Sequence, residues 1–139
     1  MVMVSETNVK GELACLKLEL RAIEKNAIVS RPTVECVYDR LVDHDGKIHR
    51  VQVKYAGCKA SHCDGAIKAY VGRSCEFRGK HVPYDGDELD AIVLYLPDVD
   101  KILWLEKAMW LGKVNVQLRY TPPKNNQTKG IHLVENHLW

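Results

Sequence analysis

The spacing of apolar residues along the first half of the chain changes from a helical period to a strand period. Over residues 10–25, apolar side chains recur at intervals of three and four: Leu13, Leu16, Leu20 and Ile23, widened by Ala14, Leu18 and Ala22. This spacing predicts an amphipathic helix whose leucine stripe faces a core. Asn26 is expected to end the helix, because Asn tolerates the left-handed backbone common at helix C-termini.

From residue 35 to residue 54, apolar and polar positions alternate around a central Asp-Gly pair. Asp-Gly favours a two-residue β-hairpin loop, and such a loop fixes the register of both strands. In that register Asp39 lies opposite Gln52, and Lys54 follows on the same face, because side chains alternate along a strand. The hairpin is therefore predicted to bring a carboxylate, an amide and an ammonium group together.

The second half of the chain predicts further strands. They are expected over residues 66–71, over the apolar run 89–96, over 101–105 after a turn, and over 114–120, with a short helix over 105–110 as an alternative and a possible terminal helix from residue 131. A chain of 139 residues with 46% hydrophobic and 27% charged residues suits one globular domain, here residues 1–139. We expect an α/β fold with a mixed sheet of four or five strands flanked by helices.

Charge changes this picture, because it is unevenly distributed. The net charge is +2, but residues 47–80 contain eight Lys or Arg and two Asp or Glu. A basic segment of this kind is typical of a surface that binds a polyanion. The candidate contacts for nucleic acid are Lys59, Lys68, Arg73, Arg78 and Lys80, with Gln127 and Lys129 in a polar loop near the C-terminus.

Cysteine content and hydropathy give expectations about compartment. Five cysteines, an odd number, do not indicate a full disulfide framework, so a reducing cytoplasm is expected. The sequence has no apolar run long enough to span a bilayer and no signal-peptide pattern, so neither membrane insertion nor secretion is expected.

The hairpin residues point to a specific chemistry. The oxygens of Asp39 and Gln52 form a sparse ligand set of the kind that suits Mg²⁺, which retains several waters when bound. Lys54 can hold a water and neutralise charge on a phosphate. A metal site, a water and a cation in one place are the requirements for phosphodiester hydrolysis.

These residues resemble the active-site pattern of the PD-(D/E)XK nuclease superfamily: a helix glutamate, an aspartate, and a Glu-x-Lys strand after a hairpin. The corresponding residues are Glu12, Asp39 and Gln52-Val53-Lys54, with Gln52 where most members carry a carboxylate. The Gln-x-Lys variant is similar to compact homing endonucleases encoded in bacterial group I introns, and the likeness extends through residues 84–102 and 122–131.

The resemblance implies a restriction-endonuclease-like fold and Mg²⁺-dependent, site-specific cleavage of double-stranded DNA, with Mn²⁺ as a possible substitute. It implies that Asp39, Gln52 and the carbonyl of Val53 bind the metal, that Glu12 acts through water or on a second ion, and that Lys54 positions the attacking water. It also implies a dimer or tetramer cutting a long, nearly symmetric target, because one active site cuts one strand.

Three other interpretations stay open at this stage. A junction-resolving nuclease shares the same active-site pattern, and Gln52 also allows a catalytically inactive DNA-binding module. Alternatively, zinc could stabilise an interaction domain through Cys58, Cys63 and Cys75 with His62, although their spacing is not that of a zinc knuckle.

Overall fold

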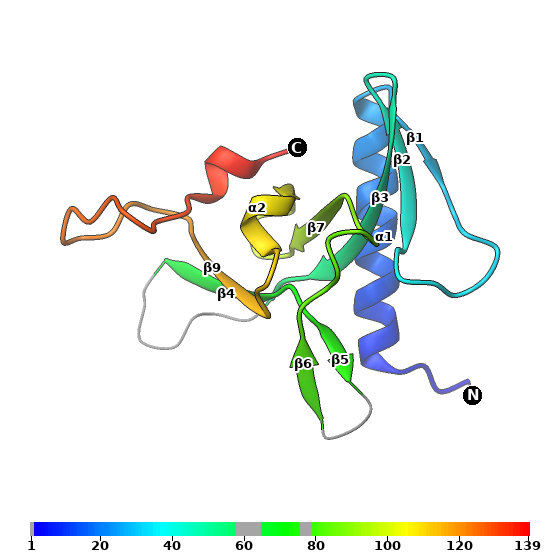
Figure 1. Cartoon of the computed structure of the whole chain (residues 1–139), viewed down its shortest axis with the longest axis horizontal. Coiled ribbons are helices and arrows are strands. Elements are labelled where there is room, and N and C mark those ends of the chain that lie inside the picture. Colours follow the sequence, from blue (N-terminus) through cyan, green and yellow to red (C-terminus); the bar gives the residue numbers. More distant parts are fainter. Residues whose placement is uncertain (1, 58–64, 76–78) are drawn as a thin grey trace.

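A long helix, α1 (Glu6–Glu24), lies across one face of a five-stranded sheet in the computed structural model of the chain, which describes residues 2–57, 65–75 and 79–139 (Figure 1). The sheet has the order β1-β2-β3-β7-β8. Its strands are β1 (Ile28–Ser30), β2 (Arg40–His44), β3 (Lys47–Tyr55), β7 (Ala91–Leu96) and β8 (Lys101–Glu106). β3 and β7 pair in parallel and the other neighbours are antiparallel, so the mixed sheet expected from the sequence is confirmed.

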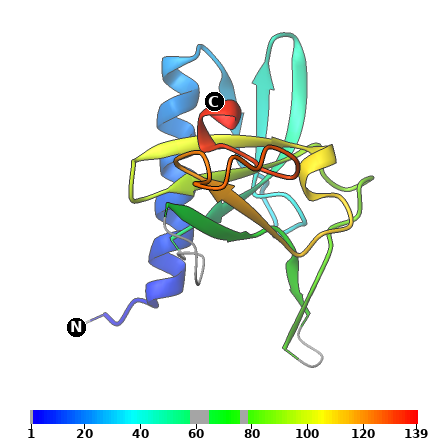
Figure 2. The same cartoon turned by 90° about the vertical axis from the view of Figure 1, so that its left-hand side faces the viewer.

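The remaining elements lie outside this sheet. They are the antiparallel pairs β4 (Ala66–Tyr70) with β9 (Asn115–Arg119) and β5 (Arg73–Cys75) with β6 (Lys80–Val82), the short helix α2 (Lys107–Trp110) and a 3₁₀ turn, η1 (Val134–His137). Figure 2 shows the β2–β3 hairpin and the β5–β6 pair extending in opposite directions. The strand and the short helix that the sequence offered as alternatives near residue 105 both form, one after the other. The helix expected from residue 131 is reduced to η1.

The β2–β3 hairpin has the predicted register. Its loop residues Asp45 and Gly46 have φ angles of 53° and 75°, the left-handed values that a type I′ turn needs at both positions. His44 pairs with Lys47, and the ladder continues to the pair of Arg40 with Val51. The dipeptide at the turn therefore sets which side chains share a face along the whole of β3.

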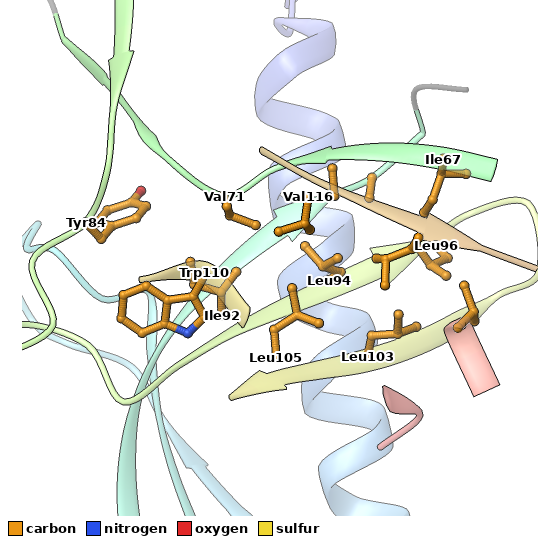
Figure 3. Packing of buried hydrophobic residues seen from close by; sticks show 14 of the residues in the cluster. Ile67, Val71, Tyr84, Ile92, Leu94, Leu96, Leu103, Leu105, Trp110 and Val116 are labelled. Carbon is orange, nitrogen blue, oxygen red and sulfur yellow. The ribbon is translucent and has the colours of Figure 1, made fainter. Parts of the chain in front are cut away.

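Two apolar clusters lie on opposite sides of the sheet. One joins α1 to the sheet through small and branched side chains, including Ala14, Leu18, Val51 and Val93. The other lies under β4, β9 and α2 and includes Leu94, Leu103, Trp110 and Val116; Figure 3 shows it in front of the strands, with α1 behind them. All six residues of β7 are buried, as expected of a central strand covered on both faces.

The predicted orientation of α1 is wrong. The helix begins at Glu6 and ends at Glu24, and Asn26 follows it with a φ of 56°, as expected. Its buried residues, however, are Ala14, Cys15, Leu18 and Ala22, while Leu13, Leu16, Leu20 and Ile23 are exposed. The small side chains of Ala14 and Ala22 let the helix axis approach the sheet closely, so the contact is formed by the residues that widened the predicted stripe and not by the stripe itself.

Neither helix in the described part of the chain combines the length and apolar composition that crossing a bilayer requires.

Candidate active site

Asp39 immediately precedes β2 and is held by the backbone of β3. Its backbone N–H donates to the carbonyl of Val51 at 2.9 Å, and its Oδ2 accepts a hydrogen bond from the N–H of Val53, also at 2.9 Å. The carboxylate is therefore fixed against the strand that contains Gln52 and Lys54. One step beyond the Arg40–Val51 pair, the register places Asp39 opposite Gln52, as the sequence predicted.

Gln52 presents a buried acceptor that no described residue satisfies. Its Oε1 lacks a hydrogen-bond partner among the residues that the structure describes. Gln52 and Lys54 alternate with the buried Val51 and Val53 along β3, so both point away from α1. Among the described residues Trp110 Nε1 and the Tyr120 hydroxyl are also buried without a partner, but the Gln52 oxygen lies on the strand face beside Asp39 and Lys54, which makes it a candidate ligand position.

Lys54 is anchored by two neutral oxygen acceptors. Its Nζ donates to the carbonyl of Gly72 at 3.3 Å and to the hydroxyl of Tyr84 at 3.0 Å, and it lies 5.2 Å from the centre of the Tyr84 ring. An ammonium group has three donors, so one remains for a further acceptor. Among the residues that the structure describes, no ion pair occupies the charge of this lysine.

Gly72 and Tyr84 are functional candidates that sequence reasoning did not identify. A side chain at Gly72 would meet the carbonyl of Val82 at 2.8 Å and the Cα of Val114 at 3.2 Å, so this position requires glycine. Tyr84 is buried as a member of the apolar cluster that includes Leu94 and Trp110, and Figure 3 shows it at the margin of that cluster. Both lie far from Lys54 in sequence, and no local spacing connects them to it; a lone Tyr in a polar segment is the one signal present.

Burial sets the electrostatics of this group. Desolvation raises the pKa of Asp39, and the hydrogen bond from Val53 and the charges of Lys54 and Arg40 oppose this only in part. Desolvation also lowers the pKa of Lys54, against the attraction of Asp39. Burial, with Asp39 adding to it, raises the pKa of Tyr84 to about 12, so its hydroxyl stays protonated. The charged forms of Asp39 and Lys54 would therefore each be stabilised by a bound group of opposite charge.

Glu12 is located differently from the other predicted residues. It lies on α1, half-exposed, with its Oε1 3.7 Å from Arg31 and 4.0 Å from Arg40. Arg40 is buried and donates to Glu19 and to the carbonyl of Asp39. The structure therefore brings Asp39, Gln52 and Lys54 to one face of β3, with Glu12 joined to this group indirectly, through Arg40.

The residues present fit a divalent metal. A carboxylate oxygen, the orphaned Oε1 of Gln52 and the nearby main chain at Val53 form the oxygen donor set that hard cations prefer. A cation there would satisfy Gln52 and offset the desolvation of Asp39. Within the described ranges, no three His, Cys, Asp or Glu side chains gather as a metal cluster, so the fit depends on the amide of Gln52.

The predicted DNA contacts are distributed over the secondary strands and a loop. Lys68 on β4, Arg73 on β5 and Lys80 on β6 are exposed. Gln127 and Lys129 are exposed in the loop after β9, where the Gln127 amide donates to the Lys129 carbonyl at 3.2 Å. Lys59 and Arg78 lie outside the described residues.

The zinc interpretation is not tested at its main residues. Cys58, His62 and Cys63 lie outside the described part of the chain, while Cys75 is a free, half-buried thiol on β5.

Comparisons with known proteins agree with the geometry. The chain matches 97% of its length to 88% of a solved bacterial homing endonuclease, I-Ssp6803I, with a TM-score of 0.69 and 18% sequence identity, a likeness that concerns the fold. A search of curated proteins finds no match. A family model for PD-(D/E)XK endonucleases matches residues 5–138, so the chain belongs to the PD-(D/E)XK endonuclease family.

Proposed function

We propose that this nuclease is a divalent-metal-dependent, site-specific endonuclease that cuts double-stranded DNA, with its active site at Asp39, Gln52 and Lys54. The observation that carries the proposal is the orphaned Oε1 of Gln52 on the same strand face as an anchored lysine and beside a partly buried carboxylate. Membership of the endonuclease family supports the reaction class, and the likeness to a bacterial homing endonuclease supports a long, nearly symmetric target in intron homing.

The protein's own groups divide the work. Asp39, Gln52 and the carbonyl of Val53 would hold Mg²⁺, or Mn²⁺ in its place, and Glu12 contributes through water. When bound, such an ion neutralises charge on the phosphate and lowers the pKa of a coordinated water. Lys54 uses its remaining donor to orient a water or a phosphate oxygen, and Tyr84 with Gly72 keeps that donor directed into the site. Fixed donors stabilise developing charge without reorganising.

The substrate also implies an assembly. One such site hydrolyses one strand, so a duplex break needs two copies related by a two-fold axis, as a dimer or within a tetramer. Exposed Lys68, Arg73 and Lys80 are proposed to contact phosphates of the duplex, together with Lys59, Arg78, Gln127 and Lys129. The cytoplasm is the location proposed for such an enzyme.

The test is cleavage of supercoiled plasmid carrying candidate intron-insertion sites, with Mg²⁺ or Mn²⁺, by the wild type and by Asp39→Ala and Lys54→Ala. Each variant is expected to lose at least about 100-fold in rate, since each removes a fixed charge at the reacting phosphate. Undiminished cutting by either variant contradicts the site assignment. Salt-sensitive binding without cleavage by the wild type would instead identify a DNA-binding module, and preferred cutting of a synthetic four-way junction would identify a resolving nuclease.

A further inference from the structure

Lys54 is held at the base of the β5–β6 ribbon, the antiparallel pair of Arg73–Cys75 with Lys80–Val82. Gly72 directly precedes β5, and Tyr84 follows the end of β6 by two residues. The Nζ of Lys54 donates to the carbonyl of Gly72 and to the hydroxyl of Tyr84. The ribbon extends away from the five-stranded sheet (Figure 1). A projecting element and the lysine of the site are therefore joined at both ends of that element.

The base of the β5–β6 ribbon is closely packed. A Cβ at Gly72 would lie 2.8 Å from the carbonyl oxygen of Val82 on the opposite strand. At the same point, the carbonyl of Val114 accepts from the N–H groups of Val71 and Gly72 at 2.9 and 3.1 Å. Close-packed groups transmit small displacements to their neighbours. A shift of β5 at its base would therefore move the Gly72 carbonyl, and with it the ammonium group of Lys54.

One face of the β5–β6 ribbon packs on β4, and the other carries two cations. The ring of His81 stacks on that of Tyr70, with 5.4 Å between the centroids and 26° between the planes. Arg73 and Lys80 alternate with Ser74 and His81 along the two strands, so both project from the opposite face, where both are exposed. Exposed cations of this kind suit DNA phosphates, and the major groove of DNA admits a two-stranded ribbon.

The two cations lie at different distances from the base of the ribbon. Arg73 directly follows Gly72 and pairs with Val82, whereas Lys80 pairs with Cys75. A strand rises about 3.3 Å per residue, so these two residue pairs are about 7 Å apart along the ribbon. A phosphate on Arg73 would therefore act at the base, and a phosphate on Lys80 would act farther out.

The charge of Arg73 also acts on the hydroxyl that holds Lys54. Burial, with Asp39 adding to it, raises the pKa of Tyr84 to about 12, and the charge of Arg73 opposes this shift. The same hydroxyl accepts the hydrogen bond from Lys54 at 3.0 Å. A phosphate bound by Arg73 would thus place a negative charge close to the group that positions Lys54.

We propose that Arg73 is a positioning residue for cleavage, which binds a DNA phosphate next to the scissile one and, through the base of the β5–β6 ribbon, holds Lys54 in place on the duplex. A guanidinium contacts a phosphate through two parallel hydrogen bonds, which fixes direction as well as distance. Lys80 contributes to binding alone, since it lies away from the base. The inference rests on the proposed function for its reaction, but the link between duplex binding and Lys54 does not depend on cleavage.

Single-turnover cleavage of a target plasmid with Mg²⁺, over a range of protein concentrations, separates the two roles. Arg73→Gln is expected to weaken binding and also to lower the rate constant at saturating protein by about 30-fold. Lys80→Gln, the matched control on the same face, is expected to weaken binding by about 3- to 10-fold and to keep that rate constant within about twofold. Both variants should melt like the wild type, because both side chains are exposed. Equal rate constants for the two variants overturn the proposal.

Magnetic resonance of the lysine ammonium groups tests the link without cleavage. Protein with isotope-labelled lysine is titrated in EDTA with a duplex carrying a candidate intron-insertion site, and the Nζ signal of Lys54 is assigned from its loss in Lys54→Ala. Saturating duplex is expected to shift this signal in the wild type and in Lys80→Gln, and to leave it unshifted in Arg73→Gln. An equal shift in Arg73→Gln overturns the proposal.

The outcomes distinguish failure of the link from failure of the proposed function. A wild type that binds duplex and shifts the Lys54 signal, but does not cut, contradicts the proposed function and supports the link between Arg73 and Lys54. A wild type that cuts DNA, with no shift of the Lys54 signal on binding, supports the proposed function and overturns the link.

Discussion

Two carboxylates beside β3 illustrate opposite uses of the same group. Asp90, just before β7, accepts from the backbone N–H of Arg50 at 2.8 Å and from its guanidinium at 3.1 and 3.2 Å, and these bonds lower the pKa of Asp90 to about 2. Asp39 accepts one backbone N–H, and burial raises its pKa. Within the described residues, the Asp90 carboxylate accepts three hydrogen bonds and has an arginine as its counter-charge, whereas the Asp39 carboxylate accepts one backbone hydrogen bond.

The difference teaches how to separate a structural carboxylate from a functional one in this fold. The Arg50–Asp90 pair joins β3 to the beginning of β7, and Arg50 also donates to the carbonyl of Asp87 at 2.8 Å. Around Asp39, by contrast, the acceptor of Gln52 has no partner in the described residues. The Arg50–Asp90 pair is therefore expected to contribute to stability, and ligand binding is expected at Asp39 and Gln52.

The sharpest way to break the comparison is to neutralise each carboxylate in turn. Asp39→Asn is expected to reduce cleavage at least about 100-fold with little change in melting temperature, because Asn still accepts from Val53 and avoids the cost of burying a charge. Asp90→Asn is expected to keep cleavage within about threefold and to lower the melting temperature. Plasmid cleavage measures the rate and calorimetry the melting temperature of both variants. If the two variants change the rate equally and the melting temperature equally, Asp39 and Asp90 do not differ in role.

Gln52→Glu sharpens the Asp39 side of the comparison. A second carboxylate beside Asp39 repels it in the metal-free protein and binds a divalent ion more strongly, so metal affinity is expected to rise about tenfold. We expect metal-dependent cleavage to be retained with an altered preference between Mg²⁺ and Mn²⁺. Titration calorimetry with each ion measures the affinity, and a complete loss of metal binding argues against direct ligation by residue 52.

Tyr84→Phe tests whether the anchor of Lys54 matters for catalysis. Losing one hydrogen bond to the ammonium group is expected to lower kcat about fivefold with KM unchanged, since Tyr84 positions Lys54 and does not touch the substrate. The matched control is Tyr95→Phe, which loses a 2.8 Å hydrogen bond to Asp100 elsewhere. The idea fails if both variants lower kcat equally.

The smallest expected effect is the loss of folding stability in acid when the Asp90 carboxyl, paired with Arg50, becomes protonated. A carboxyl whose folded pKa lies below its ordinary value of 3.8 contributes fully above that pH and loses its contribution as the pH falls toward 2. Because the pair is partly exposed, its contribution is expected to be about 1 kcal/mol. Denaturation of wild type and Asp90→Asn should differ by this amount at pH 6 and converge near pH 2; a constant difference excludes the ion pair as its source.

The parts of the fold that depend on local chemistry could be predicted from the sequence. The Asp-Gly turn fixed the β2–β3 register, and with it the common face of Gln52 and Lys54 opposite Asp39. The apolar run over residues 89–96 predicted the strand that the structure shows as the buried β7. The catalytic roles assigned to Glu12, Asp39, Gln52 and Lys54 stay predictions.

Other parts could not be predicted, for identifiable reasons. Periodicity shows that α1 is amphipathic, but both of its apolar sides suit the helical period, and the docking side was decided by how closely Ala14 and Ala22 approach the sheet. Tyr84 and Gly72 meet Lys54 through contacts that are remote in sequence, which no local pattern encodes. The ion pair of Arg50 with Asp90 is missed for the same reason.

The parallel pairing of β3 with β7 has a consequence for how the molecule reaches its native state. Residue 51 pairs with residue 91, so this contact closes a loop of 40 residues, whereas the β2–β3 hairpin closes through two. Loop-closure entropy makes such distant pairings late and slow. We therefore expect the hairpin to form early, presenting Asp39 and Lys54 to solvent, and β7 to join it in the slow phase of refolding.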